Sequence, residues 1–335
     1  MRGVAYPVTV GPRPGRQREP GAGQQRRPGW QTAAVPTRSL PTRLRRALGA
    51  QLDDLAVRRL RTLAEREATG QPVSPALAPG VVEAFGAVVG RDDSALPPGA
   101  ESAVLRAFER LWDRDFEAVP PSAAVQDMIV RQFHRLYYHS HERTWRDTRY
   151  RGVTIWKCPL DLWLYQELLD RIRPQLIVET GTAFGGSAYF LGDLCDTLGL
   201  DARITTIDIE GRPDRPVHPR VTYVTASSTD PAVVADVYAA APAGAPTLVI
   251  LDSDHSRDHV LAELRAYADL VSVGSYVVVE DTNVNGHPAY PEFGPGPMEA
   301  VDAFLAQDDR FEVDAGLEKF FMTFNPRGYL RKMRD

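Results

Sequence analysis

Short apolar runs rich in β-branched residues alternate with helix-like stretches from about residue 151 onward. The apolar runs predict strands, and the recurrence of apolar residues every three or four positions predicts amphipathic helices. This alternation is typical of an α/β fold in which helices cover both faces of a mainly parallel sheet. The predicted strands are Leu176–Glu179, Arg203–Asp208, Val221–Val224, Thr247–Asp252, Ser275–Glu280, Phe311–Asp314 and Phe320–Phe324. The predicted helices are Leu162–Ile172, Ser187–Leu198, Ala232–Ala239, His259–Ala268 and Met298–Gln307.

The first 150 residues carry other patterns and predict two further regions. Residues 1–40 are rich in Pro, Gly, Arg and Gln and hold too little apolar surface for a core, so we expect a disordered tail. Residues 41–150 show helix-like leucine spacing, as at Leu44 and Leu48, and predict a helical accessory region. The α/β domain is then expected over 151–335.

The charge of the chain is uneven and narrows the choice of partners. Its 39 Lys and Arg and 44 Asp and Glu give a net charge of −5, but residues 1–50 alone hold ten Arg and one acid. The predicted domain is therefore acidic, which argues against a nucleic-acid partner. No apolar run reaches the ~18 residues of a transmembrane helix. Because the two cysteines, Cys158 and Cys195, fit a reducing compartment, we expect a cytoplasmic protein without a membrane partner.

A glycine turn follows the first predicted strand and leads into a helix. It has the form E-x-G-x-x-x-G-x-S, made by Glu179, Gly181, Gly185 and Ser187. A dinucleotide site would instead carry G-x-G-x-x-G, and an acid at the strand end would repel a pyrophosphate. A ligand with a cationic amino group would be attracted, so the turn favours S-adenosylmethionine (SAM) over NAD. The alternative is a tight strand–helix turn without a ligand.

Three polar residues after later strands are further candidates for holding the cofactor. Asp208 ends the second strand, where an acid can accept the ribose hydroxyls. Ser228 follows the third strand and either binds adenine or caps a helix. Asp252 ends the fourth strand and belongs either to the cofactor site or to a cation site.

Carboxylates gather after the fourth and fifth predicted strands. Asp252 and Asp254 follow one strand, and Glu280 and Asp281 follow the other. Carboxylates that converge on one edge of a sheet repel each other unless a cation neutralises them, and oxygen ligands suit Mg²⁺. We predict Asp254, Glu280 and Asp281 as metal ligands, with Asp252 as a possible fourth. The alternative is a set of acids that only face solvent.

His255 adjoins these carboxylates. A neutral imidazole at that place can take a proton from a substrate hydroxyl, so His255 is the candidate catalytic base; a structural hydrogen-bonding role is the alternative. The Gly- and Pro-rich residues 282–297 directly follow the acid pair and predict a lid or substrate wall.

Several ordered motifs between about 145 and 332 resemble the cephalosporin hydroxylase / rhamnosyl O-methyltransferase family. The resemblance implies a Rossmann-like class I methyltransferase fold with SAM and Mg²⁺ as cofactors. It also implies that Glu179, Gly181 and Asp208 hold the cofactor and that Asp254, Glu280 and Asp281 hold the metal. Some related sugar methyltransferases place the metal-binding acid three residues before a catalytic histidine, which would make Asp252 the ligand and His255 the base. The motifs are W-K-C-P-L-D-L-W at 156–163, V-E-T-G-T-A-F-G-G-S at 178–187, L-D-S-D-H-S at 251–256, V-E-D-T-N-V-N-G-H-P at 279–288, G-P-G-P-M-E at 294–299 and E-K-F at 318–320.

The sequence therefore predicts a SAM- and Mg²⁺-dependent O-methyltransferase that acts on a hydroxyl of a small natural product or sugar, as a homo-oligomer. One alternative is a hydroxylase component of antibiotic tailoring. The iron-binding pattern of two histidines and one carboxylate does not stand at a predicted strand end, which argues against it. Another alternative is a non-enzymatic protein that binds the cofactor and docks a partner through the Arg-rich tail.

Overall fold

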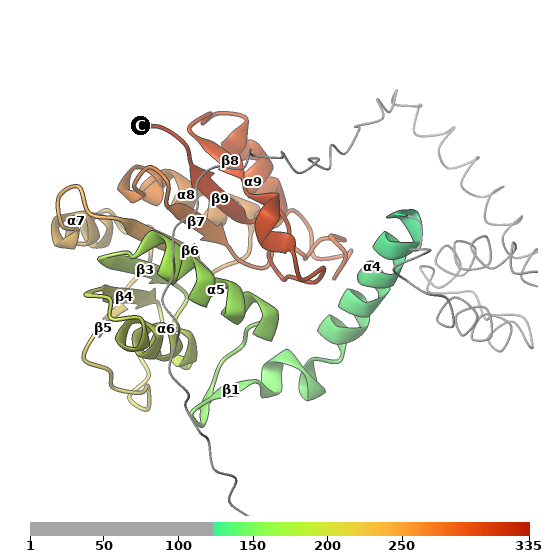
Figure 1. Ribbon diagram of the computed structural model, residues 1–335, viewed down its shortest axis with the longest axis horizontal. Helices are drawn as coiled ribbons and strands as arrows, with labels where there is room; N and C mark the ends of the chain where they lie inside the picture. The colour runs from blue at the N-terminus through green and yellow to red at the C-terminus, as the bar shows by residue number, and fades with distance from the viewer. Residues whose placement is uncertain (1–122) are drawn as a thin grey trace, which may run out of the picture. The chain divides into compact units, whose positions relative to one another are not determined.

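The computed structural model describes residues 123–335, in which one seven-stranded sheet dominates. Its strand order is β5-β4-β3-β6-β7-β9-β8 (Figure 1). The five strands β5, β4, β3, β6 and β7 run parallel to one another, and β9 is antiparallel to both β7 and β8. The strands are β3 (Leu176–Thr180), β4 (Arg203–Asp208), β5 (Val221–Thr225), β6 (Thr247–Leu251), β7 (Tyr276–Val279), β8 (Phe311–Val313) and β9 (Tyr329–Lys332).

The chain order reverses between β3 and β6. From β3 the chain moves outward through β4 and β5, and then returns to the other side of β3 with β6 and β7. Ligands of open parallel sheets bind beyond the carboxyl ends of strands at such a reversal. This topology confirms the predicted Rossmann-like class I methyltransferase fold.

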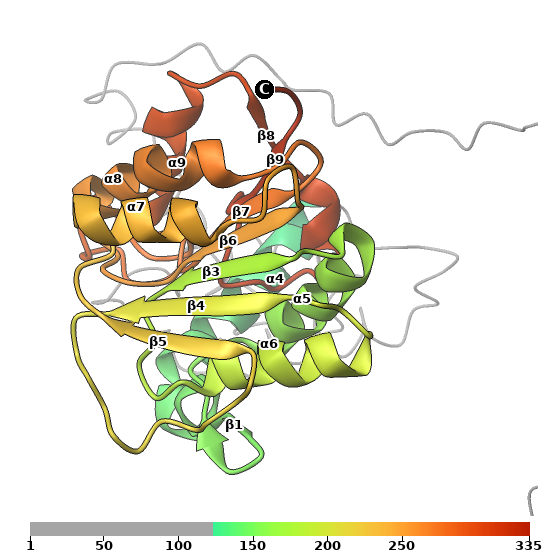
Figure 2. The same cartoon turned by 90° about the vertical axis from the view of Figure 1, so that its left-hand side faces the viewer.

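Helices cover both faces of the sheet (Figure 2). They are α5 (Pro159–Ile172) and α6 (Gly186–Thr197) on one face and α7 (Pro231–Ala240), α8 (Arg257–Tyr267) and α9 (Pro297–Leu305) on the other. The helix α4 (Ala123–His139) lies outside these two layers. Shorter elements are the 3-10 helices η2 (His141–Arg143), η3 (Trp145–Asp147), η4 (Ala268–Leu270) and η5 (Ala315–Glu318), and the hairpin strands β1 (Arg149–Tyr150) and β2 (Val153–Thr154).

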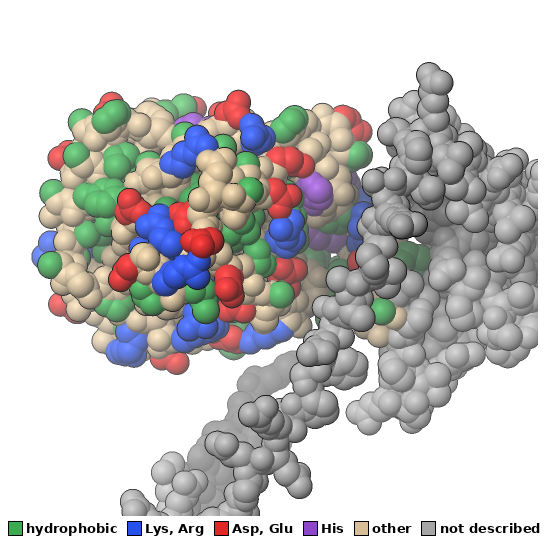
Figure 3. Space-filling model, turned by 90° about the horizontal axis from the view of Figure 1, so that it is seen from above, with side chains coloured by type: hydrophobic (Ala, Val, Ile, Leu, Met, Phe, Trp, Pro, Cys, Tyr) green, Lys and Arg blue, Asp and Glu red, His purple; other side chains and the backbone are tan. Residues whose placement is uncertain are grey.

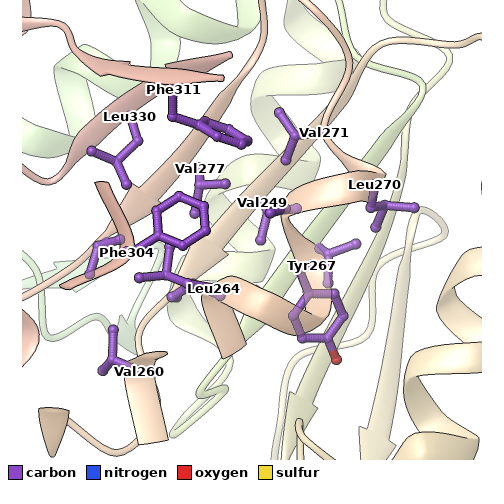
Figure 4. Packing of buried hydrophobic residues seen from close by; sticks show 14 of the residues in the cluster. Val249, Val260, Leu264, Tyr267, Leu270, Val271, Val277, Phe304, Phe311 and Leu330 are labelled. Atoms are coloured by element: carbon purple, nitrogen blue, oxygen red, sulfur yellow. The ribbon is translucent and has the colours of Figure 1, made fainter. Parts of the chain in front are cut away.

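Two apolar cores lie on the two faces because successive side chains of a strand point to opposite sides. On one face Val178 and Val249 pack with α8 and α9, as Figure 4 shows for the surroundings of Leu264 and Phe304. On the other face Ile177 packs with α5 and α6. The strands β3, β6 and β7 are therefore buried throughout, which fixes the register of their ends.

The predicted helices and six of the seven predicted strands are confirmed, with boundaries that differ by a few residues. The predicted strand Phe320–Phe324 is wrong: these residues form turns, and the last strand is β9. Phe321 is 71% exposed and has a φ of +66°, and the Phe324 N–H donates to the buried Asp161 carboxylate instead of a strand.

The described part of the predicted accessory region is α4 with the η2–η3 segment. The α4 helix packs on the loop after β7: His134 Nε2 lies 2.8 Å from Asn283 Nδ2, and the Tyr138 ring meets those of Tyr290 and Phe324. The predictions for residues 1–122 lie outside the described residues.

Among the described helices none has the length and apolarity needed to span a bilayer. Figure 3 shows acidic and basic side chains side by side on one face.

Candidate active site

The turn after β3 brings the backbone of two strand ends into contact. Gly181 has a φ of +83°, and a Cβ atom added there would stand 1.8 Å from the Asp252 carbonyl oxygen. No residue with a side chain fits this position without moving the end of β6. Gly185, at a φ of +78°, is the N-cap of α6, so its conformation sets where that helix begins.

Glu179 lies beneath this turn and is fully buried. Thr206 Oγ1 donates to its Oε2 atom at 2.6 Å, and the Ser187 hydroxyl lies close enough to lower the pKa of the carboxyl, but the Oε1 atom makes no hydrogen bond of normal geometry within the described residues. Burial raises the pKa of Glu179 to about 7, although the nearby Lys157 ammonium acts in the opposite direction. Unpaired buried polar atoms are costly, and a ligand with N–H donors would satisfy them. The turn thus fits the cationic amino group that the sequence predicts.

Asp208 holds the same turn from the end of β4. Its Oδ2 atom accepts hydrogen bonds from the N–H groups of Thr182 at 3.0 Å and Ala183 at 2.8 Å, and its Oδ1 atom accepts one from Glu210 N–H at 2.8 Å. The carboxylate therefore fixes the turn. Because each carboxylate oxygen has two lone pairs, acceptor capacity remains, and the predicted ribose contact stays a prediction.

Ser228 is held by a buried carboxyl group that the sequence reasoning missed. Its hydroxyl donates to Glu263 Oε1 at 2.5 Å, and Ser253 Oγ donates to the same atom at 2.7 Å. The Tyr267 hydroxyl donates to the Ser228 carbonyl at 2.6 Å. Glu263 thus ties the loop after β5 to the loop after β6. The predicted adenine contact of Ser228 stays a prediction.

The acidic rim, defined here as Asp252, His255 and Asp281, lies at the carboxyl ends of the neighbouring strands β6 and β7. His255 Nε2 is 3.2 Å from Asp281 Oδ2 and 4.0 Å from Asp252 Oδ1. One ligand atom of each residue lies within 4.8 Å of the others, a spacing that suits a metal ion. Burial raises the pKa of both carboxyls, because it disfavours their ionised form. A bound cation would favour the ionised form and so offset this effect.

The two other predicted ligands lie differently. Asp254 is exposed, and its Oδ1 atom accepts a hydrogen bond from Ser256 N–H at 2.8 Å, an arrangement that lowers its pKa. Glu280 is buried, and its Oε1 atom accepts hydrogen bonds from Lys157 and from the Tyr165 hydroxyl. The fold thus brings Asp252 rather than Asp254 to Asp281 and His255. The ligand and base roles remain predictions.

Sequence reasoning missed Lys157. This side chain is 2% exposed, and its Nζ atom donates to Asp252 Oδ2 at 2.7 Å and to Glu280 Oε1 at 2.6 Å. A signal existed in the composition, because the chain has only three lysines and uses arginine elsewhere. Lysine is seldom fully buried without a charged partner, so its place indicates a specific carboxylate pair.

Aromatic rings lie beside the glycine turn. Trp156, 46% exposed, meets Phe184 of the turn edge to face at 4.9 Å between ring centroids and Trp145 at 6.2 Å. The Arg146 guanidinium lies 5.1 Å from the Trp145 ring centroid. Trp156 directly precedes Lys157, whose ammonium group donates to Asp252 of the rim.

Topology, turn and rim together define a class I methyltransferase. A family model described as Rhamnosyl O-methyltransferase/CmcI matches residues 142–333. The chain belongs to this family, which confirms the predicted family and the predicted enzyme class, an O-methyltransferase.

The chain is also similar to individual proteins. The rhamnosyl O-methyltransferase of Mycobacterium tuberculosis H37Rv is 39% identical over 61% of this chain and 85% of its own length. That of Mycobacterium leprae is 35% identical over 61% of this chain and 90% of its own length. A solved structure of apo CmcI is 23% identical, with a TM-score of 0.45 over 57% of this chain and 78% of that chain.

Proposed function

We propose that this enzyme transfers the methyl group of SAM to a hydroxyl oxygen of a small molecule that carries a sugar or a similar ring, and that Mg²⁺ assists the reaction. The observation that carries the proposal is the juxtaposition of two features at the reversal point of the sheet. The turn around Glu179 suits a cationic amino group, and the acidic rim suits a divalent cation. The named activity of the relatives, rhamnosyl O-methylation, supports a sugar hydroxyl as the acceptor.

The residues of the chain divide the chemistry between them. Glu179 and the backbone of the glycine turn would hold SAM, which would give its sulfonium methyl group to the acceptor oxygen and leave as S-adenosylhomocysteine. Asp252 and Asp281 would hold Mg²⁺, which would make the acceptor hydroxyl more acidic. His255, 3.2 Å from Asp281, accepts the proton of the acceptor hydroxyl. Positioning then supplies much of the rate, because donor and acceptor meet in one orientation.

Exposed rings support an acceptor with an apolar face. Small-molecule sites are lined mainly by aromatic and apolar side chains with a few polar groups that fix orientation. The exposed Trp156 and the half-buried Phe184 provide such a surface beside the glycine turn. We propose that the acceptor ring lies against Trp156.

Calorimetry and a transfer assay test the proposal. We expect SAM to bind the purified protein, Mg²⁺ to bind with a stoichiometry of one, and labelled methyl transfer to rhamnosylated acceptors to stop on addition of EDTA. Absence of SAM binding would sink the proposal. Transfer that continues unchanged in EDTA would remove Mg²⁺ from it and leave the methyl transfer.

A further inference from the structure

Lys157 is the buried cation closest to the proposed metal site, and the function proposed above does not use it. The residue precedes α5, and its Nζ atom lies between Asp252 Oδ2 and Glu280 Oε1, at 2.7 and 2.6 Å. The Tyr165 hydroxyl, from the second turn of α5, donates to the same Glu280 oxygen. One segment before the sheet thus reaches carboxylates that follow two different strands.

A lysine suits this position for a chemical reason. Its ammonium group is compact and carries three donors, whereas an arginine guanidinium is a wide planar fork. The chain has 39 basic residues, and only three of them are lysines. At a buried position between two carboxylates, a small charge with divergent donors is what the geometry requires.

The contacts of Lys157 also leave a definite set of oxygens free. Asp252 gives its Oδ2 atom to Lys157 and turns its Oδ1 atom toward His255, whose Nε2 atom lies 4.0 Å away. Asp281 Oδ2 lies 3.2 Å from the same nitrogen. Of the three formal negative charges of Asp252, Glu280 and Asp281, Lys157 balances one, and the two that remain match a divalent cation. Glu179, which also interacts with the Lys157 charge, lies beneath the glycine turn and is counted there.

We propose that Lys157 is a built-in counter-charge and positioning residue that holds Asp252 and Glu280 together without a metal and aims Asp252 Oδ1 at the cation site. The inference rests on the proposed function in so far as that site takes Mg²⁺. Without Lys157 the two carboxylates lose their cationic partner, although Tyr165 still donates to Glu280, and the folded protein comes to depend on a divalent cation. A merely structural ion pair would show no such dependence.

Thermal unfolding of the full chain, in EDTA and in saturating MgCl₂, tests the proposal. We expect Lys157→Met to lower Tm in EDTA by roughly 10 °C, because removing one partner leaves buried charges uncompensated. Mg²⁺ should restore more than half of this loss. The matched control is Lys319→Met, which breaks the exposed pair with Glu167 and should shift Tm by less than about 2 °C in both media.

A second variant keeps the test decisive if Lys157→Met does not fold. Glu280→Gln placed in the Lys157→Met background removes the unpaired charge and should return most of the lost Tm in EDTA. If Lys157→Met lowers Tm equally in EDTA and in Mg²⁺, and Glu280→Gln does not restore it, the proposed counter-charge role of Lys157 is wrong. A wild-type Tm that ignores Mg²⁺ would instead refute the metal site under Proposed function, which separates the two failures.

Discussion

The glycine turn after β3 and the acidic rim after β6 and β7 occupy the same edge of the sheet but are stabilised differently. Backbone contacts fix the turn: Gly181 touches the Asp252 carbonyl, and Asp208 accepts two N–H groups of the turn. The rim depends on charge balance between side chains that come from distant segments, with Lys157 95 residues before Asp252. Substitutions in the turn should therefore change folding, and substitutions in the rim should change the response to cations.

The largest effect is expected at the turn. Gly181→Ala would place a methyl group 1.8 Å from the Asp252 carbonyl oxygen at a φ of +83°. We expect a loss of more than about 3 kcal/mol of unfolding free energy in urea titrations, because overlap with backbone adds to the strain of positive φ. Gly274→Ala is the matched control: its φ is +86°, but nothing lies within 4 Å, so about 1–2 kcal/mol is expected. Equal losses would show that close approach does not hold the turn.

The buried Glu179 makes the stability of the turn depend on pH. Its pKa rises from the ordinary 4.5 to about 7 on burial, so between these values the folded state binds more protons than the unfolded state. Stability should therefore fall as pH rises through this window, by at most about 3 kcal/mol. Urea titrations should show a flatter pH dependence in Glu179→Gln. The slope that remains comes from Asp161, whose pKa burial also raises to about 7, and from Asp252, Glu280 and Asp281, whose pKa values burial raises as well.

The control for this pH dependence lies in the segment after β6. The Ser256 N–H holds the pKa of Asp254 below its ordinary 3.8, so Asp254→Asn should leave the slope between 4.5 and about 7 unchanged. A slope that Glu179→Gln does not alter would mean that Glu179 is ionised in the folded protein at neutral pH.

Asp252 and Asp254 are the same residue type and lie two positions apart, but only Asp252 belongs to the acidic rim, so we expect their substitutions to have different effects. We expect Asp252→Asn to lower kcat/KM by about 100-fold or more and to weaken Mg²⁺ binding in calorimetry, since metal-ion charge stabilisation is worth several kcal/mol. Asp254→Asn, two residues on, should change either quantity by less than about twofold, because this exposed side chain lies outside the rim. The reverse ranking would restore Asp254 as the ligand.

Local patterns predicted the turn but only part of the rim. Apolar strands, a glycine turn and an acid at each strand end are signals within ten residues, and parallel strands bring those ends to one edge. The choice between Asp252 and Asp254 depends on which side chain the loop turns inward, and Lys157 reaches the rim from before α5. The pattern of apolar and polar residues shows neither which aspartate turns inward nor that Lys157 reaches the rim. The apolar run at Phe320–Phe324 misled for the same reason, because its partners are the distant Asp161 and Tyr137 side chains.

Trp156 connects the two regions and should give the smallest effect. Its ring packs on Phe184 of the turn, and its backbone leads into Lys157 at the rim. Since one exposed aromatic contact is worth about 1 kcal/mol, we expect Trp156→Ala to raise the KM for the acceptor about 5- to 10-fold, with kcat and the Tm nearly unchanged. Trp163→Ala is the matched control, because Trp163 is 58% exposed on α5 and donates to Glu167. Steady-state kinetics with varied acceptor separates the two variants, and equal KM values would place the acceptor elsewhere. A fall in kcat with an unchanged KM would instead mean that Trp156 positions Lys157 and, through it, the carboxylates of the rim. The turn and the rim would then be coupled in catalysis.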